Sequence, residues 1–102
     1  MRPEFVFHTE GFAADAELAA LASRRADALL RQAPGLARIR LVVIFQMLPN
    51  GLGIYAARGR VEGSEGAKEV TEVAHDADAA IQRAFVRLER QLRAGAAPAP
   101  AA

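Results

Sequence analysis

The stretch DADAAIQRAFVRLERQLR, residues 76–93, constrains the fold most because it carries two distinct faces at helical spacing. Apolar side chains recur every three or four residues and share one stripe, which comprises Ile81, Phe85, Leu88 and Leu92. Arginines recur at the same intervals and share another stripe, which comprises Arg83, Arg87 and Arg90. At about 3.6 residues per turn the two stripes lie more than a right angle apart. We therefore predict one amphipathic helix that buries the first stripe and presents the arginines.

Both ends of this helix carry recognisable signals. The carboxylate of Asp76 can accept hydrogen bonds from the first free backbone N–H groups, which predicts an N-cap. Gly95 is typical of a left-handed C-cap. Arg90 and Arg93 lie in the last turns, where the helix dipole favours cations. The predicted helix therefore begins after Asp76 and ends before Gly95.

The arginine stripe has two interpretations. Most charged helix faces are simply solvated, and this is the default for an isolated helix. However, only Glu89 offsets the four arginines between Arg83 and Arg93. All the cations there are arginines, whose planar guanidinium suits bidentate contact with phosphate. The arginine stripe therefore has a second interpretation, which is an RNA-binding surface.

Length and composition predict one globular domain. The chain has 102 residues, of which 52% are hydrophobic and 25% charged, and we expect a single domain over residues 1–95 followed by a disordered Ala/Pro tail over 96–102. The absence of cysteine excludes disulfides and thiolate metal sites. The N-terminal stretch has no long apolar region and no run approaches a membrane span, so we expect a cytoplasmic protein without a membrane partner.

The net charge of +1 conceals a segregation of charge along the chain. Residues 36–61 hold four arginines and no acid, whereas residues 62–78 hold six acids and one lysine. A nucleic-acid surface needs a local basic patch more than a high total charge. The secondary candidates for RNA contact are therefore the arginines of this middle region, namely Arg38, Arg40, Arg58 and Arg60.

The remaining elements follow from periodicity. Residues 4–8 alternate as a strand with both phenylalanines on one face, and residues 15–33 form a helix capped by Asp15 and stopped by Pro34-Gly35. The core stripe of this helix comprises Leu18, Ala22, Ala26 and Leu29. Residues 37–46 and 53–62 alternate as two further strands.

The pairing of those two strands can be predicted. Asn50-Gly51 suggests a two-residue hairpin, but that register would place apolar residues opposite arginines. A shift by one residue places Leu41 opposite Gly59, so we predict a longer or bulged turn. The same register sets Arg40 against Arg60, a repulsion that either solvent screening or a docked anion would offset.

A fourth strand is predicted over residues 67–75. Val70 and Val73 fall on opposite faces of it, so we expect a bulge or irregular pairing near Thr71-Glu72. The element order is then β-α-β-β-β-α. It predicts an α+β fold with a four-stranded sheet and both helices packed on one face, which leaves the middle arginines on the open face.

No constellation of residues indicates catalysis. Ser23 and Ser64 have no histidine in a recognisable arrangement, and no Gly-rich loop precedes a helix. His75 with Asp76 and Asp78 is better explained as a strand end followed by a helix cap than as a metal site. We therefore expect no enzyme activity, cofactor, metal or small-molecule substrate.

The last helix resembles that of the ribosome hibernation-promoting factor family, also called protein Y or sigma-factor modulation protein. The resemblance rests on the run Leu88-Glu89-Arg90-Gln91-Leu92, preceded by Asp76 and the pair Ala80-Ile81, behind the same order of elements. It spans roughly residues 4–94 and is faint in the middle. This chain looks like a divergent short form of the family.

The resemblance implies a function. Members bind the small ribosomal subunit through rRNA, block initiation and protect idle ribosomes, which connects them with translation regulation and the stress response. The family's basic positions on the two helices correspond here to Arg25, Arg31, Arg87 and Arg90, with Arg93 adjacent to a further one. The arginine stripe adds Arg83 to this RNA-binding set.

The chain also departs from the family's pattern. Ala28 and Ala94 stand at two further basic positions, and Asp78 stands where the family usually has a tyrosine. These departures remove positive charge and an aromatic ring from the expected surface.

The alternative function is a protein-interaction module of the same fold that pairs with itself or with another protein and does not bind ribosomes. It would use the fourth strand or the hairpin tip, where Met47, Leu48 and Leu52 are apolar. RNA binding should weaken steeply with salt, whereas a hydrophobic interface should persist.

Overall fold

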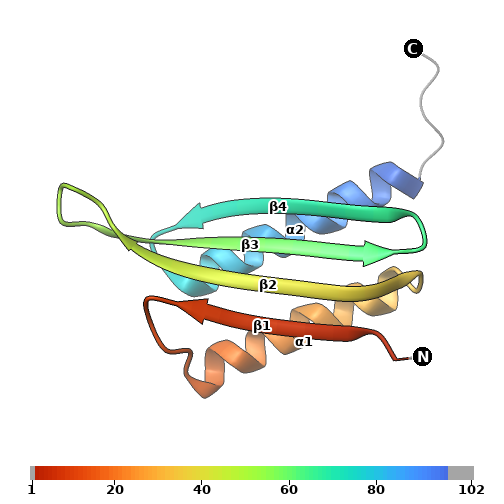
Figure 1. Ribbon diagram of the computed structural model, residues 1–102, viewed down its shortest axis with the longest axis horizontal. Coiled ribbons are helices and arrows are strands. Elements are labelled where there is room, and N and C mark those ends of the chain that lie inside the picture. Colours follow the sequence, from red (N-terminus) through yellow and green to blue (C-terminus); the bar gives the residue numbers. More distant parts are fainter. Residues whose placement is uncertain (1, 97–102) are drawn as a thin grey trace, which may run out of the picture.

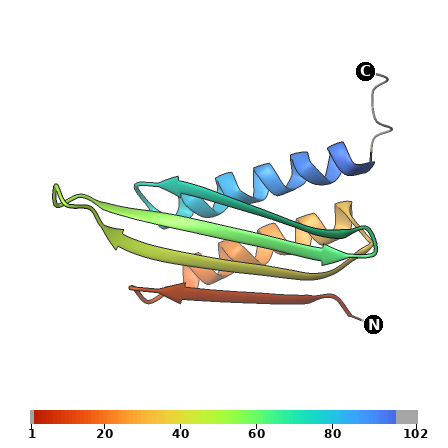
Figure 2. The same cartoon turned by 45° about the horizontal axis from the view of Figure 1, so that its top comes forward.

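The computed structural model describes residues 2–96, with side chains up to residue 93, and has the element order β-α-β-β-β-α. The elements are β1 (Glu4–Glu10), α1 (Ala16–Gln32), β2 (Leu36–Met47), β3 (Gly53–Gly63), β4 (Gly66–Ala74) and α2 (Ala77–Ala96). Both helices cover one face of a four-stranded sheet and leave the other face open (Figures 1 and 2). The predicted α+β architecture is confirmed.

The strands lie in the order β1-β2-β3-β4, so β1 and β4 are the edges. β1 pairs parallel with β2, as a β-α-β unit requires, and the two following pairs are antiparallel. The predicted register is confirmed, because Leu41 lies opposite Gly59 and Arg40 opposite Arg60. The turn is also longer than two residues. The N–H of Leu48 donates to the carbonyl oxygen of Leu52 (2.8 Å), and Gly51 adopts a φ of 86°.

The core lies between the helix layer and the inner face of the sheet. The predicted stripes of both helices meet the inner rows of β2 and β3, and the largest fully buried side chains are Phe85, Leu29, Ile39, Leu41, Ile81, Leu88, Val43 and Val61. At the centre, α2 comes so close to β3 that a Cβ atom on Gly59 would lie 2.9 Å from Cδ1 of Leu88. The absence of a side chain at Gly59 therefore lets α2 pack directly on the sheet.

Both helices begin where the sequence predicts. Asp15 accepts a hydrogen bond from the N–H of Leu18 (2.8 Å), and Asp76 accepts one from the N–H of Ala79 (2.7 Å). The predicted end of the second helix was wrong, because α2 continues through Gly95 to Ala96. A glycine costs a helix only about 1 kcal/mol, and alanine on either side offers the highest helix propensity. The expected tail lies, apart from Ala96, outside the described residues.

The predicted irregularity in the fourth strand was also wrong. β4 pairs with β3 in one continuous register from Gly63 opposite Gly66 to Tyr55 opposite Ala74. Val70 is buried under α2, whereas Val73 lies on the open face and is 47% exposed. The prediction failed because it assumed that every valine of the strand faces the core. An open sheet face accepts an apolar side chain without a bulge.

Candidate nucleic-acid interface

The arginines of the helix layer fall into two groups according to their contacts. Arg31, Arg90 and Arg93 are exposed, and none of them forms an ion pair with another described residue. Arg24 belongs with them, since it is exposed and lies two turns before Arg31 on the same helix. Arg24 was not among the predicted RNA-binding residues, although its seven-residue spacing from Arg31 places both on one side of the helix.

Arg25 lies between the two helices and contacts both. Its guanidinium carbon lies 5.8 Å from the centre of the Phe85 ring, and its Nη2 atom lies 3.7 Å from the carboxylate of Glu89. The side chain is 29% exposed, and its Nε atom is buried without a hydrogen-bond acceptor among the described residues. Burying an N–H group without an acceptor costs free energy, and the cation–π contact and the ion pair partly offset that cost. Arg25 thus joins α1 to α2 and offers only part of its guanidinium to a ligand.

Arg83 and Arg87 reach from α2 to the free edge of β4. Arg83 donates a hydrogen bond to the carbonyl oxygen of Val73 (3.0 Å). Arg87 donates one to the carbonyl oxygen of Thr71 (3.3 Å) and another to the carboxylate of Glu72 (2.9 Å). These carbonyl groups have no partner strand, so the two arginines satisfy acceptors that an edge strand otherwise presents to other chains.

The four secondary candidates for RNA contact, Arg38, Arg40, Arg58 and Arg60, lie on the open sheet face among acidic side chains. We call this network of arginines and acids the charge lattice. Three of these arginines pair with acids: Arg38 with Glu4 (3.0 Å), Arg60 with Glu62 (2.9 Å) and Glu69 (3.3 Å), and Arg58 with Glu69 (3.8 Å). Arg40 is exposed and forms no ion pair with the described residues. The charge lattice leaves less positive charge free than the sequence implied.

Acidic neighbours also explain how Arg60 tolerates Arg40 on the adjacent strand. Hydrogen bonds to Glu62 and Glu69 raise the pKa of Arg60, and the hydrogen bond from Arg60 lowers the pKa of the Glu62 carboxyl. The two carboxylates therefore offset the like-charge contact within the protein. A docked anion is not needed for this purpose.

Within residues 2–96 no three acidic or histidine side chains gather closely enough to hold a metal ion. Neither described helix is long and apolar enough to cross a membrane.

No protein-family model matches the chain, and no curated protein matches it by sequence. Two solved structures share its arrangement of helices and strands. One is a ribosomal subunit interface protein from Coxiella burnetii, with a TM-score of 0.77 and 12% identity, covering 88% of this chain and 93% of that one. The other is the N-terminal domain of Protein Y from Thermus thermophilus, with a TM-score of 0.72 and 22% identity, covering 90% of this chain and 97% of that one. The chain has the Protein Y fold.

This match confirms, at the level of the fold, the resemblance that was drawn from the last helix. Within the Protein Y fold of this chain, the helix layer and the open sheet face present different electrostatic surfaces. The helix layer exposes arginines without ion-pair partners, namely Arg24, Arg31, Arg90 and Arg93, whereas most arginines of the sheet face are neutralised by neighbouring acids. The helix layer is therefore the candidate interface for a polyanion.

Proposed function

We propose that this protein binds the small ribosomal subunit in the cytoplasm through rRNA phosphates and acts as a translation inhibitor of the hibernation-factor kind. One observation carries the proposal: the fold is shared, over nearly the whole chain, with a ribosomal subunit interface protein and with the N-terminal domain of Protein Y. The exposed arginines of the helix layer support it. Binding of this kind requires no catalytic residue, cofactor or metal.

The chemistry of the helix layer suits phosphate more than base recognition. Arginine donates two parallel hydrogen bonds to a phosphate and keeps its charge at any physiological pH. Arg31, Arg90 and Arg93 are free to do so without breaking an internal contact. Arg83 and Arg87 can join only by leaving the edge of β4, and Arg25 only with its partly exposed guanidinium. Affinity would then come from phosphate neutralisation and shape.

The test is co-sedimentation with purified small ribosomal subunits at low and moderate salt. The helix-layer variant Arg31→Ala/Arg90→Ala removes two exposed charges that no described acid pairs with. The matched control, Arg40→Ala/Arg58→Ala, removes two exposed charges from the opposite face. We expect the wild type and the control to pellet with the subunits at low salt, and the helix-layer variant to lose most of its binding.

Two results would contradict the proposal in different ways. If the wild type does not pellet even at low salt, the fold serves another partner. If only the control variant loses binding, the interface is the open sheet face, and the secondary candidates Arg38, Arg40, Arg58 and Arg60 become the primary ones.

Self-association is a second candidate function, and exposed apolar side chains at the hairpin tip and on the open sheet face favour it. The side chains of Met47 and Leu52 at the hairpin tip are 63% and 55% exposed. Separately, an apolar strip runs across the open sheet face from Ile44 through its cross-strand neighbour Ala56 to Val73. Light scattering after size-exclusion chromatography would detect a dimer that persists at high salt and that Met47→Glu/Leu52→Glu dissociates. A monomer at all concentrations would exclude this function.

A further inference from the structure

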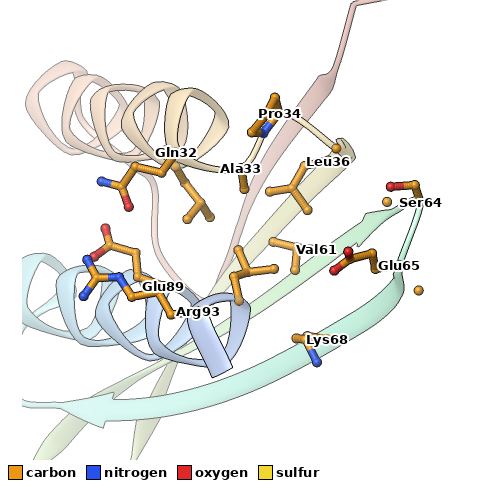
Figure 3. A pocket seen from close by; sticks show the side chains of 15 residues that line it. Gln32, Ala33, Pro34, Leu36, Val61, Ser64, Glu65, Lys68, Glu89 and Arg93 are labelled. Atoms are coloured by element: carbon orange, nitrogen blue, oxygen red, sulfur yellow. The ribbon is translucent and has the colours of Figure 1, made fainter. Parts of the chain in front are cut away.

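A cavity of about 530 Å³ opens where the last turns of both helices meet the turn between β3 and β4 (Figure 3). Its volume falls within the range of small-molecule sites, and its lining is mainly apolar, as such sites usually are. The apolar walls are Leu29, Leu36, Val61 and Leu92, and charged side chains stand among the residues that line it. The cavity adjoins the exposed surface of the helix layer at Gln32 and Arg93.

Backbone contacts hold one wall of the cavity in place. The N–H of Ser64 donates to the carbonyl oxygen of Gly35 (3.2 Å), and a Cβ atom on Gly63 would lie 2.5 Å from that same oxygen. The loop after α1 and the turn after β3 therefore cross at van der Waals distance, which only glycine permits at position 63. The cavity beside this crossing is already formed in this structure, so a ligand would not have to create it.

The charges around the cavity favour an anion. Lys68 lies on the helix-facing side of β4 and is half-buried, opposite Val61. Within residues 2–96 neither Lys68 nor Arg93 forms an ion pair. Of the two acids that line the cavity, Glu89 is already paired with Arg25, which leaves Glu65. The positive charge is thus in excess, and it lies on the β4 and α2 sides.

The helix dipole indicates how an anion would lie. The carbonyl groups at the end of α1 carry a partial negative charge and border the cavity near Gln32 and Ala33. The last turn of α2 has the same polarity, so a negatively charged group is disfavoured beside both helix ends and favoured beside Lys68 on β4. An apolar body would then extend over Leu36 and Leu92.

We propose that this cavity binds a small organic anion with an apolar body, such as a medium-chain carboxylate, with the carboxylate beside Lys68. The site shares Arg93 with the proposed ribosome interface but is centred on Lys68, which is not part of that interface. Neither the fold comparison nor the other exposed arginines of the helix layer argue for it, so either function can fail without the other.

The experiment uses three probes with the same apolar chain and different head groups: octanoate, octanol and octylammonium. Each is titrated below its micelle concentration into the full-length ¹⁵N-labelled protein, and backbone amide shifts are followed by NMR. We expect shifts around the cavity, at Ala33, Leu36, Gly63, Lys68 and Leu92. Octanoate should bind about three- to fivefold more tightly than octanol, the ratio that one partly exposed ion pair supplies, and octylammonium should bind most weakly.

Three variants sharpen the test. Lys68→Met keeps an apolar stem without the charge and should reduce octanoate affinity to that of octanol, whereas Arg40→Met on the open face should leave it unchanged. Ala33→Phe should fill the cavity and weaken all three probes. Equal binding of octanol and octanoate, shifts confined to the open sheet face, or a Lys68→Met variant that binds octanoate normally would each overturn the proposal. Lys68→Met alone decides it if Ala33→Phe does not fold.

Discussion

Arg87 on α2 donates a 2.9 Å hydrogen bond to the carboxylate of Glu72 on β4. The same Nη1 atom donates to the carbonyl oxygen of Thr71, so this guanidinium bridges the helix and the sheet edge. A phosphate that approaches the helix layer must compete with an internal carboxylate for Arg87, but it meets Arg90 without such competition. This difference between two neighbouring arginines of one helix leads to separate predictions for stability and for binding.

Arg87→Ala should destabilise the protein by about 1 kcal/mol, because it removes an ion pair and a hydrogen bond to an otherwise unpaired edge carbonyl. Urea unfolding monitored by circular dichroism measures the change. Arg90→Ala is the control on the same helix and should change the free energy of unfolding by less than about 0.5 kcal/mol. Equal effects of the two substitutions would show that the contacts of Arg87 contribute nothing to stability.

Glu72→Gln should strengthen binding to the small ribosomal subunit about two- to fivefold, because a neutral amide holds Arg87 less strongly than a carboxylate does. Co-sedimentation at fixed salt measures the affinity. Glu65→Gln makes the same change in net charge at an exposed acid that pairs with no described residue, so it controls for non-specific attraction. If both variants bind equally, the release of Arg87 has no role in binding.

Gly59→Ala should destabilise the protein by about 1–3 kcal/mol, since its new methyl group would meet Leu88 at 2.9 Å. Without that contact, alanine in a strand would be neutral or slightly stabilising. The same substitution should therefore cost much less in a Leu88→Ala background, where the opposing side chain is gone. Thermal or urea unfolding of the four proteins of this double-mutant cycle measures the coupling. Additive effects would place the strain elsewhere.

Glu62 should titrate below the ordinary range of a glutamate, because Arg60 donates a hydrogen bond to its carboxylate and lowers its pKa. A depressed folded-state pKa means that the associated stabilisation is present above the unfolded pKa and is lost as the pH falls through the folded one. A carbon-detected NMR titration measures this pKa. Arg60→Ala should return it toward the usual value, and Arg58→Ala should leave it unchanged. A normal Glu62 pKa in the wild type would contradict the hydrogen bond between Arg60 and Glu62.

Ribosome binding should weaken steeply with ionic strength. Four to six arginine–phosphate contacts predict a slope of about −3 to −5 when the logarithm of the binding constant is plotted against that of the salt concentration. Binding constants measured between about 50 and 200 mM salt determine this slope. A slope near zero would contradict phosphate neutralisation and favour an interface built from the apolar strip and hairpin tip.

Most of the fold could be predicted because its signals are local. Helix stripes, caps at Asp15 and Asp76, and strand alternation each depend on residues a few positions apart. The register of β2 and β3 was also predictable, since only one pairing keeps Leu41 and its row on the buried face. The two errors, at Gly95 and in β4, arose where a local signal was weak. One glycine does not end a helix, and an edge strand can place Val73 in solvent.

The candidate site could be predicted only as a set of arginines. Periodicity placed Arg83, Arg87 and Arg90 on one exposed stripe, and all three are exposed. Periodicity could not show which of these arginines form internal contacts. The groups that bind Arg83 and Arg87 come from β4, which lies 10 to 16 positions earlier in the chain. The cavity beside Lys68 could not be predicted either, since its walls come from both helices, from three strands and from two turns.

The amino-acid sequence by itself determined which residues are buried, in what order the elements follow, and where arginine is concentrated, because each of these depends on spacing along the chain. Only the tertiary structure decided which arginines remain free. An ion pair forms when packing brings two elements together, as it brings Glu89 to Arg25 and Glu72 to Arg87. The energy of such a pair depends on distance and solvent access, and neither is set until the helices lie on the sheet.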